Sequence, residues 1–120
     1  MKLITAVLKP GQFDEVVQAA VDAGARGLTA GEVRGFGQQY GYREGPHGYL
    51  EASDIPHRRG AILVPKLRVD MIVQDEIAEA VVDAIAKAMN TGTIGGGKIW
   101  VSAVESVLRV RTGERDRDAV

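Results

Sequence analysis

The sequence predicts an α+β protein of the ferredoxin-like type, a βαββαβ sandwich with a long loop between its second and third strands. Two observations support this prediction. A strand, helix and strand pattern occurs twice, in residues 2–36 and 64–104, and a polar stretch separates the two halves. The chain has 120 residues, which is enough for one domain, residues 1–120, around a single core.

The first half begins with an alternating, β-rich run over residues 2–8, which ends at Pro10-Gly11. The apolar residues that follow recur at helical spacing as far as Gly24; they are Phe13, Val16, Val17, Ala20 and Val21. A second strand is predicted over residues 27–36, although its glycines weaken it.

The second half repeats this order. Residues 64–73 alternate as a strand, and Asp75 is placed to cap the helix behind it. The apolar stripe of that helix comprises Ile77, Val81, Val82, Ile85 and Met89. A strand over residues 99–104 and a shorter one over residues 107–111 complete the predicted elements.

Both faces of the first strand carry apolar side chains. The strand alternates between two sets, with Leu3, Thr5 and Val7 on one face and Lys2, Ile4, Ala6 and Leu8 on the other. In a ferredoxin-like sandwich both helices cover the same face of the sheet. We therefore expect the second face to be buried against other subunits, so the sequence predicts a homo-oligomer.

Composition excludes several classes of protein. The formal net charge is −1, which argues against a broad nucleic-acid surface or an anionic membrane surface. The absence of cysteine removes disulfides, thiolate zinc sites and thiol catalysis together. No apolar run approaches the ~20 residues of a spanning helix, and the first residues lack an apolar signal segment. We expect a cytoplasmic protein without membrane insertion.

The glycine-rich segment of residues 91–98 is the first candidate site. It contains four glycines and Lys98 between the second helix and a strand. Glycines let backbone N–H groups approach a phosphate, and a lysine adds a positive charge. The alternative is a helix-to-strand turn with no ligand. It is not a Walker loop, because a strand follows it where that motif requires a helix.

Further candidates are two arginines and a second glycine cluster. Arg109 and Arg111 lie two apart on a predicted strand, so both guanidinium groups would leave one face and could hold adjacent phosphates. The alternative is a solvated strand edge paired with Glu105 or Asp70. The second cluster spans residues 35–41, where the glycines could equally form a flexible exit into the following loop.

The long polar segment, residues 37–63, is too long for an inert connection in so small a domain, so we expect it to be functional. It holds all three tyrosines of the chain, which suit a partner interface or packing on a neighbouring surface. It also holds five side chains that could bind a metal ion: His47, His57, Glu44, Glu51 and Asp54. The alternative is that these are solvated loop residues without a metal.

Several motifs in this order resemble the PII signal-transduction family over nearly the whole chain. They are Met1-Lys2-Leu3-Ile4-Thr5-Ala6-Val7 with Lys9-Pro10, Gly27-Leu28-Thr29, Glu32-Val33 with Gly35-Phe36-Gly37, Pro65-Lys66, Thr91-Gly92 through Gly97-Lys98, and Arg109-Val110-Arg111-Thr112-Gly113-Glu114. The resemblance implies a homotrimer of ferredoxin-like subunits that binds ATP or ADP in clefts between subunits. In the family, 2-oxoglutarate and Mg²⁺ join ATP, and a long T-loop acts on transporters and enzymes.

The resemblance also implies roles for individual positions. Residues 91–98 correspond to the family's B-loop and residues 37–63 to its T-loop, with a C-terminal segment over 106–120. The implied nucleotide-binding residues are Val7, Thr29, Gly35, Phe36, Gly37, Gln38, Gln39, Asp70, Ile72, Gly92, Gly95, Gly96, Gly97, Lys98, Arg109 and Arg111. The implied effector site, for 2-oxoglutarate or another small anion such as bicarbonate, comprises Gln39, Gly41 and Lys66.

The chain departs from the family pattern in both loops. Gln38 stands where the family has arginine, Tyr40 where it has lysine, and Tyr42 where it has histidine; Thr93 and Gly96 replace a lysine and an aspartate. The tyrosine that receives a nucleotide in many relatives is absent, with Leu63 near its place, and Tyr49, the candidate to replace it, lies in surroundings unlike those of the family. Because Gln38 and Thr93 leave fewer cations near a γ-phosphate, we expect the nucleotide preference to shift from ATP toward ADP or AMP.

The predicted function is therefore a nucleotide-sensing regulatory protein of nitrogen or carbon metabolism, and not an enzyme. A weak ATPase or phosphotransferase is one alternative, but no histidine lies on the strands around the glycine-rich segment to act as a nucleophile. A metal-binding ferredoxin-like trimer that uses His47 and His57 is the other.

Overall fold

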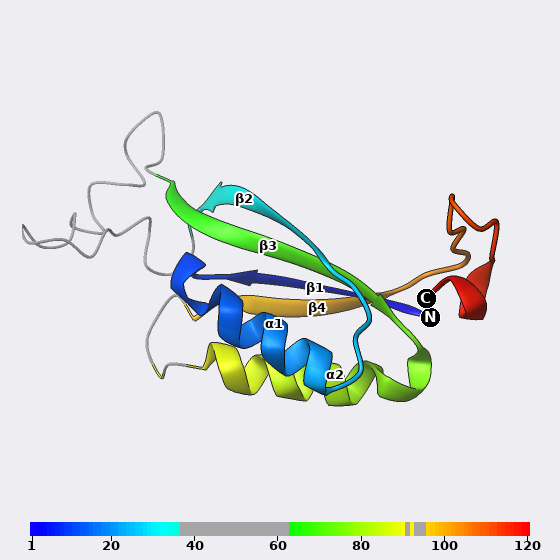
Figure 1. Ribbon diagram of the computed structural model, residues 1–120. Coiled ribbons are helices and arrows are strands. Elements are labelled where there is room, and N and C mark those ends of the chain that lie inside the picture. The colour runs from blue at the N-terminus through cyan, green and yellow to red at the C-terminus, as the bar shows by residue number, and fades with distance from the viewer. Residues whose placement is uncertain (37–62, 91, 93–95) are drawn as a thin grey trace, which may run out of the picture.

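A computed structural model describes residues 1–36, 63–90, 92 and 96–120 (Figure 1). The elements follow the order β1 (Lys2–Leu8), α1 (Phe13–Asp22), β2 (Thr29–Gly35), β3 (Val64–Val73), α2 (Asp75–Met89) and β4 (Lys98–Ala103). Short 3₁₀ turns cover Pro10–Gln12 and Asp116–Ala119. This is the predicted strand and helix order, and the prediction of a ferredoxin-like fold is confirmed.

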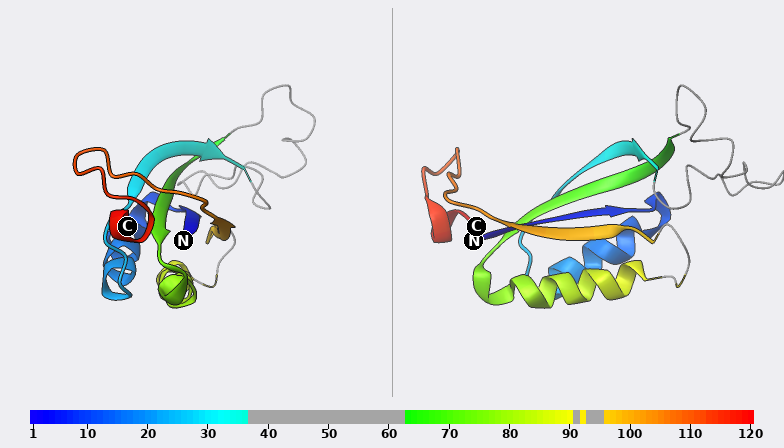
Figure 2. Two further views of the ribbon diagram at one scale, coloured as in Figure 1. Left: turned by 90° about the vertical axis from the view of Figure 1, so that its right-hand side faces the viewer. Right: turned by 180° about the vertical axis from the view of Figure 1, so that it is seen from behind.

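The four strands form one antiparallel sheet in the order β2-β3-β1-β4. Both helices lie on the same side of this sheet, as the two further views make clear (Figure 2). The register pairs Val7 with Lys98 at one end of β1 and Lys2 with Ala103 at the other. β4 therefore begins at one end of the sheet and ends at the opposite one.

The core lies between the helices and the sheet, where the two sequence periodicities meet. β1 contributes Ile4, Ala6 and Leu8, all fully buried, and the period of two in β3 contributes Val69, Met71 and Val73. From the helices the buried residues are Val16 and Ala20 of α1 and Ala78, Val81, Ile85 and Met89 of α2. The predicted helical stripes therefore mark the buried faces, with Ile77 and Val82 partly buried at the margin.

The face of the sheet away from the helices carries both polar and apolar side chains. On it Thr5 is paired in register with Asp70 of β3 and Trp100 of β4. The Trp100 side chain is 42% exposed, and the Arg68 guanidinium lies 5.9 Å from its ring centroid. This distance is within the range of a cation–π contact.

Two local predictions are wrong. Residues 107–111 do not form a strand: Leu108 makes one isolated bridge with Arg115, and the chain reverses between them. The reversal is stabilised by backbone hydrogen bonds from Arg109 N–H to Glu114 O and from Gly113 N–H to Arg109 O, with Gly113 at φ +73°.

Asp75 does not cap α2, because it is the first residue of that helix and the preceding Gln74 occupies the cap position without a side-chain hydrogen bond. The Asp75 carboxylate instead pairs with the Met1 amino group at 2.8 Å. An acidic residue in the first turn still interacts favourably with the helix dipole.

Candidate functional site

Most of the predicted site residues that the structure describes lie in two groups, one at each end of the sheet. α2 ends and β4 begins at the left-hand end in Figure 1, whereas the segment after β4 lies at the right-hand end with both termini. The first group comprises Val7, Gly35, Phe36, Lys66, Gly92, Gly96, Gly97 and Lys98. Arg109 and Arg111 belong to the second group, and Thr29, Asp70 and Ile72 lie on the strands between. Gly37, Gln38, Gln39, Gly41 and Gly95 lie outside the described residues.

The described ends of the glycine-rich segment are closely held. Gly92, at φ +71°, donates its backbone N–H to Asn90 Oδ1 at 3.0 Å. Gly97 has φ +108°, and a Cβ there would collide with the Val7 carbonyl oxygen and the Met89 methyl group. Only glycine fits that position, because both the backbone conformation and the space exclude a side chain. Lys98 follows directly and begins β4 beside Val7.

A side chain that the sequence reasoning missed anchors the other side of this segment. Gln12 is buried, and its Nε2 donates to the Met89 carbonyl oxygen at 2.8 Å. Its Oε1 accepts the Lys9 backbone N–H at 3.2 Å. The signal in the sequence is slight, since a glutamine after Pro10-Gly11 gives no sign that it is buried.

Positive charge gathers next to this end of the sheet. Burial, and then the neighbouring Lys9 ammonium, lower the pKa of Lys66 below its ordinary value. A like charge nearby disfavours the charged form of Lys66. A hollow of about 460 Å³ lies on the same region of β2 and β3, and its charged lining residues are Arg34, Lys66 and the acidic Glu32.

Asp70, which the resemblance assigns to the purine and ribose pocket, is engaged within the chain. Its carboxylate accepts the Thr5 hydroxyl at 2.6 Å and pairs with Arg68 at 3.0 Å. Burial raises the pKa of this carboxyl, but the hydrogen bonds from Thr5 and Arg68 and the charge of Arg68 outweigh it, so the pKa is lowered overall.

The arginine pair lies in the turn and not on a strand. Arg109 is bonded to its own C-terminal segment, with Nη1 3.3 Å from Glu114 Oε1 and Nη2 donating to the Ala119 carbonyl oxygen at 3.3 Å. The alternative of a strand edge paired with Glu105 or Asp70 does not hold for Arg109, whose described partners are Glu114 and Ala119. Arg111 lies in the exposed turn beside Val110, whose side chain is 90% exposed.

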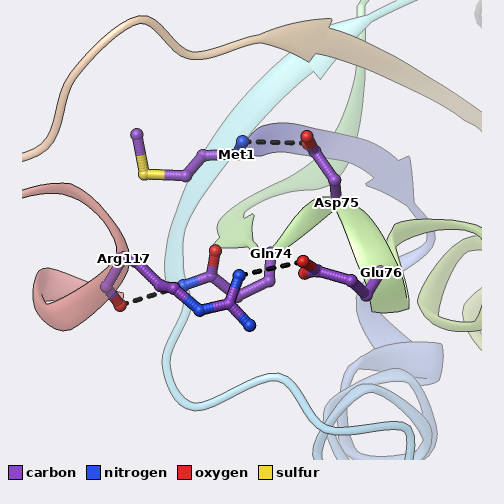
Figure 3. Close-up of polar contacts among 5 residues, drawn as sticks. All are labelled: Met1, Gln74, Asp75, Glu76 and Arg117. Carbon is purple, nitrogen blue, oxygen red and sulfur yellow. Dashed lines mark hydrogen bonds and ion pairs between the residues drawn. The ribbon is translucent and has the colours of Figure 1, made fainter.

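The C-terminal segment is attached to the start of α2 (Figure 3). Arg117 Nη1 lies 2.9 Å from Glu76 Oε1, and Gln74 Nε2 donates to the Arg117 carbonyl oxygen at 2.9 Å. The hydrogen bond from Arg117 lowers the pKa of Glu76. These contacts hold the base of the arginine turn and border an open pocket of about 560 Å³, which Arg26 also lines.

No group of three metal-ligating side chains comes together within the described parts of the chain. The candidate ligands His47, His57, Glu44, Glu51 and Asp54 all lie outside those parts, as do the three tyrosines. Among the helices that the structure describes, none is long and apolar enough to cross a membrane.

Comparison with known proteins agrees with the resemblance. The family model described as nitrogen regulatory protein P-II matches residues 1–114. The chain is 44% identical over 120 residues to a nitrogen regulatory protein P-II of Rhizobium meliloti (strain 1021), with all of both chains covered. Proteins of the same name from Mesorhizobium japonicum and Azospirillum brasilense are 42% and 39% identical, again over the full length of both chains.

Proposed function

This chain belongs to the nitrogen regulatory protein P-II family, and on that basis we propose that it binds adenine nucleotides in clefts between the subunits of a homotrimer. Through residues 37–63 it would then act on a transporter or enzyme of nitrogen or carbon metabolism, in the cytoplasm. The family supports a role in signal transduction.

The observation that carries the proposal is the separation of the two cationic groups. Lys98 begins β4 beside Val7, whereas the turn with Arg109 and Arg111 follows the other end of β4, beyond the pairing of Ala103 with Lys2. Under this proposal, each subunit contributes one half of a phosphate site at each end of its sheet. In a closed ring of identical subunits, the arginine turn of one subunit can meet the glycine-rich segment of the next.

The sheet face away from the helices supports the ring. It presents Leu3, Val7 and Trp100 next to the bonded trio of Thr5, Arg68 and Asp70. Apolar side chains around a satisfied polar cluster suit a face that packs on other subunits. The exposed Val110 of the arginine turn suits the same role at the edge.

In the proposed cleft, Gly92, Gly96, Gly97 and Lys98 contact the phosphates together with Gly95, and the arginine turn of the neighbouring subunit adds its two cations. Glycine N–H groups and guanidinium forks are the donors that phosphate oxygens accept. The purine and ribose lie against Val7, Gly35 and Phe36 of one subunit, with Thr29, Asp70 and Ile72 from the strand region and Gly37, Gln38 and Gln39 from the loop.

A small anionic effector is proposed to bind at Lys66. Lys66 is partly buried and close to the Lys9 ammonium, which together lower the pKa of Lys66, and a carboxylate would interact favourably with this cationic pair. Gln39 and Gly41 complete this site. The candidates are 2-oxoglutarate, together with Mg²⁺ and ATP, or bicarbonate.

Nucleotide preference follows from the cations that are missing. Gln38 and Thr93 stand where the family has arginine and lysine, so the γ-phosphate of ATP has fewer charged partners. Each charge-assisted hydrogen bond contributes about 1.5–3 kcal/mol. We therefore expect a shift toward ADP or AMP relative to ordinary family members.

Titration calorimetry with ATP, ADP and AMP, each with and without 2-oxoglutarate and bicarbonate, tests the proposal. We expect ADP to bind at least as tightly as ATP, and Lys98→Ala to weaken both. Lys87→Ala, which removes an exposed lysine of the last turn of α2, is the matched control and should change neither affinity. ATP binding well above ADP would contradict the preference, and no binding of any nucleotide would contradict the site.

A regulatory protein should hydrolyse the nucleotide slowly. We expect phosphate release far below the ~1 per second at which typical enzymes begin. Turnover at or above that rate would favour the ATPase alternative and contradict the regulatory role.

A further inference from the structure

Gln12 connects two distant parts of the chain through a buried side-chain amide. Its side chain is 8% exposed. The amide N–H that binds the Met89 carbonyl oxygen spans 77 positions in the sequence, and the amide oxygen binds the Lys9 backbone three positions away. A neutral amide can donate and accept at the same time, so both of its polar ends are satisfied by backbone groups.

Both backbone partners adjoin the segments that the proposed site uses. Met89 is the last residue of α2, and its carbonyl is one of the four that a helix leaves without an internal partner. Asn90 follows and accepts the Gly92 N–H, while the Met89 methyl group limits the space at Gly97. Lys9 comes two residues after Val7, which pairs with Lys98.

We propose that Gln12 is a positioning residue for the phosphate site, an inference that rests on the proposed nucleotide-binding function. By donating to the Met89 carbonyl, the Gln12 amide determines where α2 ends relative to β1. It thereby sets the distance between Asn90 and Gly97, the two residues that flank most of the glycine-rich segment. Described residues that are already placed, such as Gly92 and Gly97, lose less conformational entropy when they bind an anion.

Separate substitutions test the donor and the acceptor of the Gln12 amide. Gln12→Lys keeps a donor for Met89 and loses the acceptor for Lys9, whereas Gln12→Glu does the reverse and sets a carboxylate against a carbonyl. Gln12→Met fills nearly the same volume without either bond. Gln18→Met is the control, because Gln18 is exposed and bonds only to Asp22 in the described part of α1.

ADP affinity is measured by titration calorimetry at a temperature well below the thermal unfolding midpoint of each variant. We expect Gln12→Met and Gln12→Glu to bind ADP about tenfold more weakly, because both variants lack the buried hydrogen bond to the Met89 carbonyl oxygen. Gln12→Lys should stay within about threefold of the wild type, and Gln18→Met should not change. Equal affinities for Gln12→Lys and Gln12→Glu, or wild-type affinity for Gln12→Met, would overturn the proposal.

Hydrogen exchange without nucleotide separates this proposal from the proposed function. We expect the backbone amides of Asn90 and Gly92 to exchange about tenfold faster in Gln12→Met than in Gln18→Met. Faster exchange in a protein that binds no ADP would contradict the nucleotide site and leave Gln12 as an anchor of the loop. Unchanged exchange at both amides would overturn the positioning role by itself.

Discussion

The Thr5 hydroxyl donates a 2.6 Å hydrogen bond to the Asp70 carboxylate across the β1–β3 pair, on the face of the sheet that the helices leave uncovered. The two residues are 65 positions apart, and Thr5 is fully buried although it points away from the core. Asp70 also binds Arg68, which contacts Trp100. One polar cluster therefore joins three strands on this face.

Thr5→Val should destabilise the protein by about 1–3 kcal/mol, because it leaves the Asp70 carboxylate without one of its donors. Thr5→Ser, which keeps the hydroxyl, should cost clearly less. Urea denaturation of the three proteins at one fixed concentration measures the difference. Equal stability of the valine and serine variants would show that the hydrogen bond contributes nothing.

Asp70 should give the protein an acid-sensitive contribution to stability. The folded-state pKa of this carboxyl lies below the ordinary value of 3.8, so the contribution is present above that value and is lost as the pH falls through the lower folded pKa. The free energy of unfolding of the wild type should exceed that of Asp70→Asn at about pH 6, and the gap should shrink by about pH 3. A gap independent of pH over this interval would be inconsistent with a lowered pKa.

Gly97 and Gly92 should respond very differently to alanine. Gly97 has φ +108°, and the Cβ of Gly97→Ala would collide with the Val7 carbonyl oxygen. The substitution should therefore lower the free energy of unfolding by about 3 kcal/mol or more. Gly92→Ala meets no heavy atom of the described residues within 4 Å, so among them only the positive φ opposes it, at about 1–2 kcal/mol. Thermal denaturation compares them, and similar losses would mean that Gly97 does not pack against Val7.

Subunit mixing tests whether the cleft is shared between chains. Lys98→Ala and Arg111→Ala should each bind ADP poorly when pure. When the two are unfolded together in equal amounts and refolded as a mixture, about one quarter of the clefts should carry both native side chains and recover wild-type affinity. If the mixture binds no better than its parts, the lysine and the arginine do not meet across an interface.

Much of the fold could be predicted because its signals are local. The alternation of residues 2–8 and 64–73 and the helical spacing of Val81 and Ile85 depend only on neighbours in the chain. The arginine turn could not be predicted in this way. Alternating apolar and basic residues at 107–111 match a strand, but Gly113 and the hydrogen bonds to Glu114 reverse the chain there.

The sequence by itself determined which segments form helices and strands, which of their faces are apolar and where the glycine-rich segment lies, since these are properties of residue order. Only the tertiary structure decided that Gln12 holds Met89, that Thr5 holds Asp70, and that Lys98 and Arg111 lie toward opposite ends of the sheet. These relationships depend on strand order and register, which bring together residues far apart in the sequence.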